Sequence, residues 1–345
     1  MLKRILWLFV LLILAAGAMA GVLYVRVNKP YRGYATPDQF IEIPQGAGSR
    51  TIGDRLVAAG VIRDFATYRI ALYMSGQGRH LQAGEYRFDR PMTPFDVIDK
   101  IARGDVFVIT VTFREGLSIV EMSKIFESHG LGKAAEFVAA ASDPEPIREL
   151  DAEAKDLEGY LFPDTYPLPR KTAAAQLVRL MVQRFAQAFS PELRQKAADR
   201  SLSIRQTVTL ASIVEKETGR PDERPLVAAV YANRLRIGMA LQCDPTVIYA
   251  LQRAGKYNGN LRREDLSMDS PYNTYRHAGL PPGPIASPGR ASLEAAVQPA
   301  PANFLYFVSK NDGSHAFAGT LDEHNRNVQK FQVEYFRERR AGKQP

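Results

Sequence analysis

The alternation of apolar and polar positions sets the first residues apart from the rest of the chain. An uncharged apolar run from Ile5 to Val25 follows Lys3 and Arg4 and ends at Arg26. Such a run has the roughly 20 residues that a helix needs to cross a bilayer. We therefore predict a cytoplasmic tail over 1–4 and a transmembrane anchor over 5–25.

A cleaved signal peptide is the alternative for this segment, because AMA at 18–20 has the small-x-small form of a cleavage site. We favour a retained anchor, since the apolar run continues through Val22, Leu23 and Val25. Basic residues flank both ends, so the short N-terminal tail rather than charge favours the N-in topology. We expect a single-pass protein of the inner (plasma) membrane, folded on the periplasmic or outer side.

A strand-like start, a glycine, an amphipathic helix and a second glycine occur twice, over 43–62 and 113–131. The two glycines have the same separation in both segments, and apolar helix positions coincide. This pattern predicts a duplicated strand–helix unit whose second glycine follows the helix end. The matching glycines are Gly46 and Gly60 with Gly116 and Gly130, and the matching core positions are Ile52 with Met122 and Leu56 with Phe126.

The remaining pattern predicts an α+β protein with a linker over 26–38, a small module over 39–105, a larger mixed α+β domain over 106–335 and a basic tail over 336–345. Small strand–helix modules of this kind resemble LysM-type glycan-binding units, and a structural spacer without sugar contacts is the open alternative. A proline-rich and glycine-rich stretch over 271–301 is expected to form a functional rim. We predict helices over 94–103, 171–189, 203–218, 226–235, 244–252 and 322–339, and strands over 106–113 and 303–308.

The composition of the chain limits the classes of binding partner. The chain is 46% hydrophobic and 24% charged, as in ordinary globular proteins, and its net charge of +8 favours an anionic partner. Zinc-ligand spacing and RNP-like aromatic runs are absent from the sequence, which argues against nucleic acid. Cys243 is the single cysteine and has no histidine near it in sequence, so a small half-buried residue explains it better than a nucleophile.

The segment from 205 to 219, RQTVTLASIVEKETG, is apolar except near its end, where two glutamates follow one another closely. On a helix, Glu215 stacks above Ala211 and Ser212, whereas Glu217 points about 200° away. We expect an apolar setting to keep Glu215 protonated, as a general acid requires. The alternative is a pair of surface acids at a helix end, paired with Lys216, Arg220 or Arg224.

A resemblance decides between these interpretations. Six ordered motifs look like those of the endolytic murein transglycosylases of the YceG-like family, the MltG proteins, along most of the chain. They are GYLFPDTY (159–166), LASIVEKET (210–218), NRLRIGMALQCDPTVIY (233–249), YNTY (272–275), GLPPGPIASPG (279–289) and NFLYFV (303–308).

The resemblance implies a lyase that cuts the MurNAc–GlcNAc bond of peptidoglycan and leaves 1,6-anhydro-MurNAc ends, with Glu215 as general acid and base. The sugar's own 6-hydroxyl is then the nucleophile, so neither a metal nor another cofactor is implied. It also implies a place beside the enzymes that synthesise the strands. Asp164 is a possible second acid that we expect to cap its loop, and the candidate substrate contacts are Gln242, Tyr272, Asn273 and Tyr275. A non-catalytic wall-binding scaffold and a hydrolytic muramidase remain the alternatives.

Overall fold

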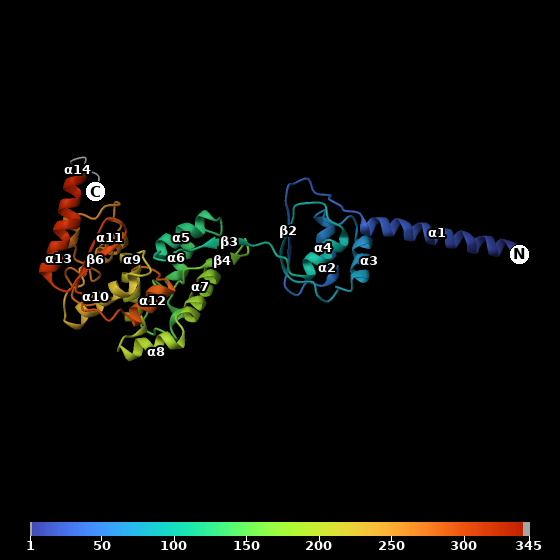
Figure 1. The fold of residues 1–345 in the computed structure, drawn as a ribbon. Coiled ribbons are helices and arrows are strands. Elements are labelled where there is room, and N and C mark those ends of the chain that lie inside the picture. The colour runs from blue at the N-terminus through green and yellow to red at the C-terminus, as the bar shows by residue number, and fades with distance from the viewer. Residues whose placement is uncertain (1, 341–345) are drawn as a thin grey trace. The chain divides into compact units, whose positions relative to one another are not determined.

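The structure is a computed structural model that describes residues 2–340, with side chains from residue 6 onwards. The chain forms two compact units (Figure 1). Unit 1 runs up to Ile109 and includes Pro167–Arg170, and unit 2 comprises Thr110–Tyr166 and the residues from Lys171. Met1 of the predicted cytoplasmic tail and residues 341–345 of the predicted basic tail lie outside the described residues. The functional domain boundaries stay predictions.

Helix α1 (Leu2–Asn28) begins unit 1. From Leu6 to Asn28 it is long and apolar enough to cross a membrane, with a mean hydropathy of 2.5. The helix continues three residues beyond the predicted anchor, and Val27 is buried in the core of unit 1. The predicted linker over 26–38 is thus helical at its start, and Tyr31 pairs further on with Met92.

Unit 1 encloses its core between two strands and three helices. Strand β1 (Gln39–Ile43) pairs antiparallel with β2 (Gly84–Phe88), and Ile41 lies opposite Tyr86. Helices α2 (Ser49–Ala58) and α3 (Phe65–Ser75) lie between the strands in sequence, and α4 (Pro94–Ala102) follows them. Helix α4 is the helix predicted over 94–103, and it begins at a capping box. Helix α3 was not predicted.

The duplicated unit is confirmed at the level of local conformation. Helices α2 and α5 (Ile119–Ser128) have the same length, and the core positions named from sequence are buried in both. The matching glycines adopt the left-handed conformation that favours glycine. Their φ angles are 77° and 68° for Gly46 and Gly60, and 76° and 69° for Gly116 and Gly130.

Unit 2 is predominantly helical, with two small sheets, so the mixed α+β class is confirmed. Helix α9 (Ile204–Glu217) lies at its centre, because residues 207–214 are all buried and α9 packs against α8, α10, α11 and α12. Its other elements are β3 (Ile109–Thr112) from Thr110 onwards, α6 (Ala134–Ala141), η1 (Glu145–Ile147), β4 (Thr165–Leu168) as far as Tyr166, α7 (Ala174–Ala188), α8 (Pro191–Asp199), α10 (Arg224–Arg236), α11 (Asp244–Arg253), η2 (Arg263–Ser267), α12 (Arg290–Val297), β5 (Tyr306–Ser309), β6 (His315–Ala318), α13 (Leu321–Val328), η3 (Gln329–Glu334) and α14 (Tyr335–Arg340).

Several predicted elements differ from the structure. The strand predicted over 106–113 is shortened to β3, and the Phe107 N–H bonds instead to the carbonyl of Glu85 in β2. Strand β5 begins later than predicted, and a π-helical turn, η3, interrupts the last helix. Helix α12 lies in the second half of the proline-rich stretch. It begins at Arg290, two residues after Pro288.

Candidate active site

The last turn of helix α9 contains two acids, Glu215 and Glu217. The helix starts at Ser203, whose hydroxyl accepts the Gln206 N–H in a capping box, and its last residue is Glu217. Carboxylates near a helix C-terminus are disfavoured by the helix dipole. Both glutamates therefore need compensating partners, and the structure gives each a different set.

Both carboxylate oxygens of Glu215 accept hydrogen bonds. Arg224 on α10 donates from Nη2 to Oε1 over 3.1 Å, and the Gly289 backbone N–H donates to Oε2 over 3.0 Å. The Glu215 side chain is 6% exposed. Charge-assisted bonds of this kind stabilise the carboxylate. The setting of Glu215 is thus polar, and the expectation of apolar surroundings was wrong. Arg224 pairs with Glu215, as the alternative of helix-end acids expected, and Gly289 lies 74 positions away in sequence.

Arg224 connects two acids. Its Nη2 lies 3.6 Å from Oε2 of Glu115, and its Nε donates to the Ser292 hydroxyl over 3.1 Å. The Arg224 side chain is 9% exposed, so its charge is poorly solvated and depends on these partners. A single buried guanidinium therefore holds Glu215 and faces Glu115.

Glu115 lies on a loop that the proline-rich segment holds in place. Gly116 donates its N–H to the Ser287 carbonyl, and Ser287 donates its own to the Leu117 carbonyl, each over 2.8 Å. A methyl group at Gly289 would overlap the Glu115 carboxylate, so a side chain here would displace Glu115 from its present position. Burial, followed by repulsion from Glu215, raises the pKa of Glu115, although Arg224 opposes the shift.

Glu215 and Glu115 line an open cleft of about 450 Å³ in unit 2. Asp164 lies in the same cleft, and a hydrogen bond from Arg184 lowers its pKa. The Asp164 carboxylate also accepts the Thr165 N–H, so the expected loop-capping role is confirmed. The cleft is lined by Thr112, Phe113, Arg114, Glu115, Pro163, Asp164, Thr165 and Glu215.

Glu217 has a separate, enclosed environment. Its carboxylate accepts the Tyr231 hydroxyl over 2.7 Å, and burial raises its pKa despite hydrogen bonds from Cys243 and Tyr231. Burial, with the Glu217 charge nearby, also raises the pKa of the Cys243 thiol, which is fully buried. Cys243 is therefore a core residue, and the two glutamates point to different sides of α9 as their spacing predicted.

The four candidate substrate contacts lie apart from the cleft lining. Asn273 is fully buried and donates both amide hydrogens, to the carbonyls of Leu266 and Met268. The Tyr275 hydroxyl donates to Asp244 over 2.6 Å, and Gln242 has a left-handed φ of 49°. These contacts shape the 242–275 region from within.

Tyr272 borders another cavity of unit 2, of about 180 Å³, which also contains Glu158. The Tyr272 ring packs on Tyr249, and the Arg253 guanidinium lies over both rings. Glu158 is buried and accepts hydrogen bonds from the Ile119 N–H and the Tyr249 hydroxyl, each over 3.1 Å. Burial, with Asp156 nearby, raises the pKa of Glu158 to about 8.

Comparison with known proteins decides the family. The model of the YceG-like family matches residues 41–330, which include all three acids of the cleft, Glu115, Asp164 and Glu215. The chain belongs to the YceG-like family.

Relatives of this YceG-like chain have been named for their activity. It is 33% identical over 312 residues to a protein of Bacillus subtilis named endolytic murein transglycosylase, with 84% of each chain covered. It is 29% identical to a protein of the same name from Streptococcus pneumoniae D39, covering 93% of this chain but 64% of that longer protein. A crystal structure of a YceG-like protein from Listeria monocytogenes matches with a TM-score of 0.57 and 29% identity, covering 85% of this chain and 99% of the other.

Sequence reasoning missed Glu115 and Gly289, and it considered Arg224 only as a surface partner. One signal was available in this YceG-like sequence. The duplicated segments align Gln45, before Gly46, with Glu115, before Gly116. This difference between the two copies singles out Glu115 as a position to examine.

Proposed function

We propose that this YceG-like chain is an endolytic lytic transglycosylase of peptidoglycan, with Glu215 as its general acid and base. The observation that carries the proposal is the geometry at Glu215, where both carboxylate oxygens are held at the edge of an open cleft. Relatives named endolytic murein transglycosylase support the reaction class. No second class of protein explains a fixed carboxylate in a cleft as directly.

The reaction uses one carboxyl group twice. Protonated Glu215 donates its proton to the glycosidic oxygen while the bond from C1 of MurNAc to GlcNAc breaks. The 6-hydroxyl oxygen of the same MurNAc then bonds to C1, and its proton returns to Glu215. The products are a 1,6-anhydro-MurNAc end and a GlcNAc end, and no water is consumed.

The neighbours of Glu215 have defined roles in this proposal. Arg224 and the Gly289 N–H stabilise the carboxylate that forms when the proton leaves. They also fix its direction relative to the sugar, which is the positional part of catalysis. Gln242, Tyr272 and Tyr275 remain proposed sugar contacts, whereas the contacts of Asn273 favour a loop-shaping role.

A hydrolytic muramidase is the second candidate, and the presence of Glu115 and Asp164 in the same cleft favours it. Ordinary glycoside hydrolases need a second carboxylate to activate water or to form a covalent intermediate. Burial and repulsion from Glu215 raise the pKa of Glu115, which makes its carboxylate a stronger base than an ordinary one, so Glu115 is the candidate for that second role. The hydrogen bond from Arg184 lowers the pKa of Asp164 and makes it a weaker base.

We further propose that α1 anchors the chain in the plasma membrane with both units on the outer side, near the synthases that make glycan strands. The apolar length of α1 supports an anchor. Unit 1 is proposed as the LysM-like module, which its two helices between paired strands support.

Mass spectrometry of the products from purified peptidoglycan tests the proposal. Anhydro ends are expected, and reducing ends would instead identify a muramidase. If the folded protein leaves the glycan strands uncut, the remaining interpretation is a non-catalytic wall-binding scaffold.

A further inference from the structure

A cavity of about 530 Å³ opens where α1 joins the folded part of unit 1. One wall is apolar and belongs to the membrane-length part of α1. The opposite rim is basic and belongs to the end of α1 and to the start of α3. The apolar wall consists of Ala18, Gly21, Val22 and Val25, and the rim consists of Arg26, Lys29 and Arg63 with Tyr31, Thr67 and Pro94.

Helix α1 is fixed to unit 1 at this place. Val27 is 1% exposed within the core, and Arg26 forms an ion pair with Asp64 at 3.5 Å. Unbroken helix continues to Asn28, without a flexible joint at the membrane exit. A bilayer crossed by α1 therefore meets unit 1 at a defined level, with the apolar wall at hydrocarbon depth and the basic rim at the headgroups.

The rim carries more positive than negative charge. Asp64 is the acid beside the three basic residues of the rim, and it forms an ion pair with Arg26. The Arg63 guanidinium lies over the Tyr31 ring, 4.8 Å from its centre. Among residues 6–340, neither Lys29 nor Arg63 has an ion-pair partner within 4 Å. Two cations at the headgroup level thus remain available to an anion.

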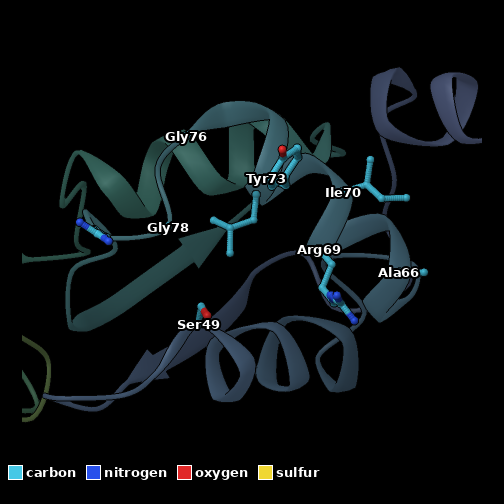
Figure 2. Close-up of a pocket in the computed structure, with 9 residues that line it drawn as sticks. Ser49, Ala66, Arg69, Ile70, Tyr73, Gly76 and Gly78 are labelled. Atoms are coloured by element: carbon cyan, nitrogen blue, oxygen red, sulfur yellow. The ribbon is translucent and has the colours of Figure 1, made fainter.

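Helix α3, which packs against α1, has an outer face suited to the same interface. Tyr73 on this face is 90% exposed, and Arg69 and Ile70 accompany it at helical spacing around a second cavity of about 740 Å³ (Figure 2). Exposed aromatic and basic side chains beside a membrane segment are typical of the lipid–water interface.

We propose that the cavity between α1 and α3 binds an anionic phospholipid of the surrounding bilayer. Its phosphate lies between Lys29 and Arg63, and one acyl chain follows the wall at Gly21 and Val22. The apolar wall favours a lipid over a soluble anion, and the two cations favour an anionic headgroup over a zwitterionic one. The inference rests on the proposed retention of α1 as an anchor.

The test uses the full chain, reconstituted in vesicles of phosphatidylcholine with phosphatidylglycerol and released into detergent for native mass spectrometry. The wild type is expected to retain phosphatidylglycerol in preference to phosphatidylcholine. Lys29→Gln with Arg63→Gln should reduce that preference by about an order of magnitude, since each basic residue near an anionic surface contributes roughly fivefold. The matched control is Arg90→Gln with Lys124→Gln, which removes the same charge from exposed positions elsewhere.

A second variant tests the apolar wall without changing charge. A Cβ at Gly21 would meet nothing within 4 Å, so Gly21→Leu should fold and reduce retention of both lipids by occupying the groove. Equal lipid preference in the wild type and the Lys29/Arg63 variant would overturn the site. Release of the chain from vesicles by alkaline carbonate would overturn the anchor and the site together, and the peptidoglycan cleavage assay is independent of both.

Discussion

The guanidinium of Arg224 lies 3.1 Å from the carboxylate of Glu215, and both side chains are almost completely buried. The same nitrogen faces Glu115 at 3.6 Å. The carboxylates of Glu215 and Glu115 and the guanidinium of Arg224 form a charge-coupled group at the edge of the cleft. A substitution of one member therefore changes the electrostatic environment of the other two. This coupling determines how substitutions at the three positions should differ.

Glu215→Gln should abolish glycan cleavage while the chain still folds, although with lower stability, because the buried Arg224 loses its carboxylate partner. Glutamine keeps the volume, and its carbonyl oxygen can accept the hydrogen bond from either Arg224 or Gly289, but it cannot transfer a proton. Loss of general acid catalysis costs about 10² to 10⁴ in rate. Product release from purified peptidoglycan measures the effect.

Glu217→Gln is the matched control for that experiment. Glu217 is buried on the other side of α9 and accepts the Tyr231 hydroxyl, so the variant should keep most of the activity. An inactive Glu217→Gln beside an active Glu215→Gln would reverse the assignment of the two glutamates.

Arg224→Gln should destabilise the fold as well as reduce cleavage. Removing one partner of a buried ion pair typically costs about 3–5 kcal/mol, because the remaining charge has no compensation. Urea denaturation of the single variants and of Arg224→Gln with Glu215→Gln measures the coupling. Equal destabilisation by the single and double Arg224 variants would show that the ion pair does not matter to stability.

Glu115→Gln separates the two candidate reactions. Folding raises the pKa of Glu115, so its ionisation opposes folding, and any stability it contributes is present at low pH and is lost as pH rises through the folded-state pKa. The variant should therefore gain stability relative to wild type at neutral pH but not at pH 4. A transglycosylase should retain anhydro products in this variant, whereas loss of reducing-end products would identify Glu115 as part of a muramidase.

The helices of the site and Arg224 as a possible partner of Glu215 could be predicted from sequence, but the Gly289 N–H could not. Apolar periodicity and the capping sequence at Ser203 define α9, and its spacing separates Glu215 from Glu217. Gly289 lies 74 positions further along the chain from Glu215. Only the packing of α12 against α9 brings its N–H to the carboxylate. The polar setting of Glu215 thus depends on tertiary packing, which the local sequence pattern does not predict.

Removing residues 1–24 should give a soluble protein that cuts purified peptidoglycan but fails in cells. Unit 2 carries the proposed chemistry, and α1 supplies only the location. Removing residues 1–27 should lower the thermal midpoint further, because Val27 belongs to the core of unit 1 and burial of a valine contributes about 1.5–3 kcal/mol. Thermal unfolding of the two truncations compares them, and equal midpoints would place Val27 outside the stabilising core.

The buried Glu158 should make the stability of unit 2 depend on pH. Its pKa is raised from 4.5 to about 8 by burial, and then by Asp156, against the hydrogen bonds from Ile119 and Tyr249. An acid whose pKa is raised by folding binds its proton more tightly in the folded state. Its contribution is therefore fully present below pH 4.5 and is lost as pH rises through about 8, with a slope of up to about 1.4 kcal/mol per pH unit.

Glu158→Gln should remove this dependence, because the glutamine amide does not ionise. Its carbonyl oxygen accepts the Ile119 N–H, and its NH2 group can donate to the Tyr249 hydroxyl oxygen. The free energy of unfolding from urea titrations, measured between pH 5 and pH 9, should fall more steeply for wild type than for the variant. Asp143→Asn is the matched control, since this exposed acid lies on the surface of unit 2. Parallel pH profiles for wild type and Glu158→Gln would mean that Glu158 is ionised in the folded protein, and the Arg253 guanidinium would then be the group that compensates its charge.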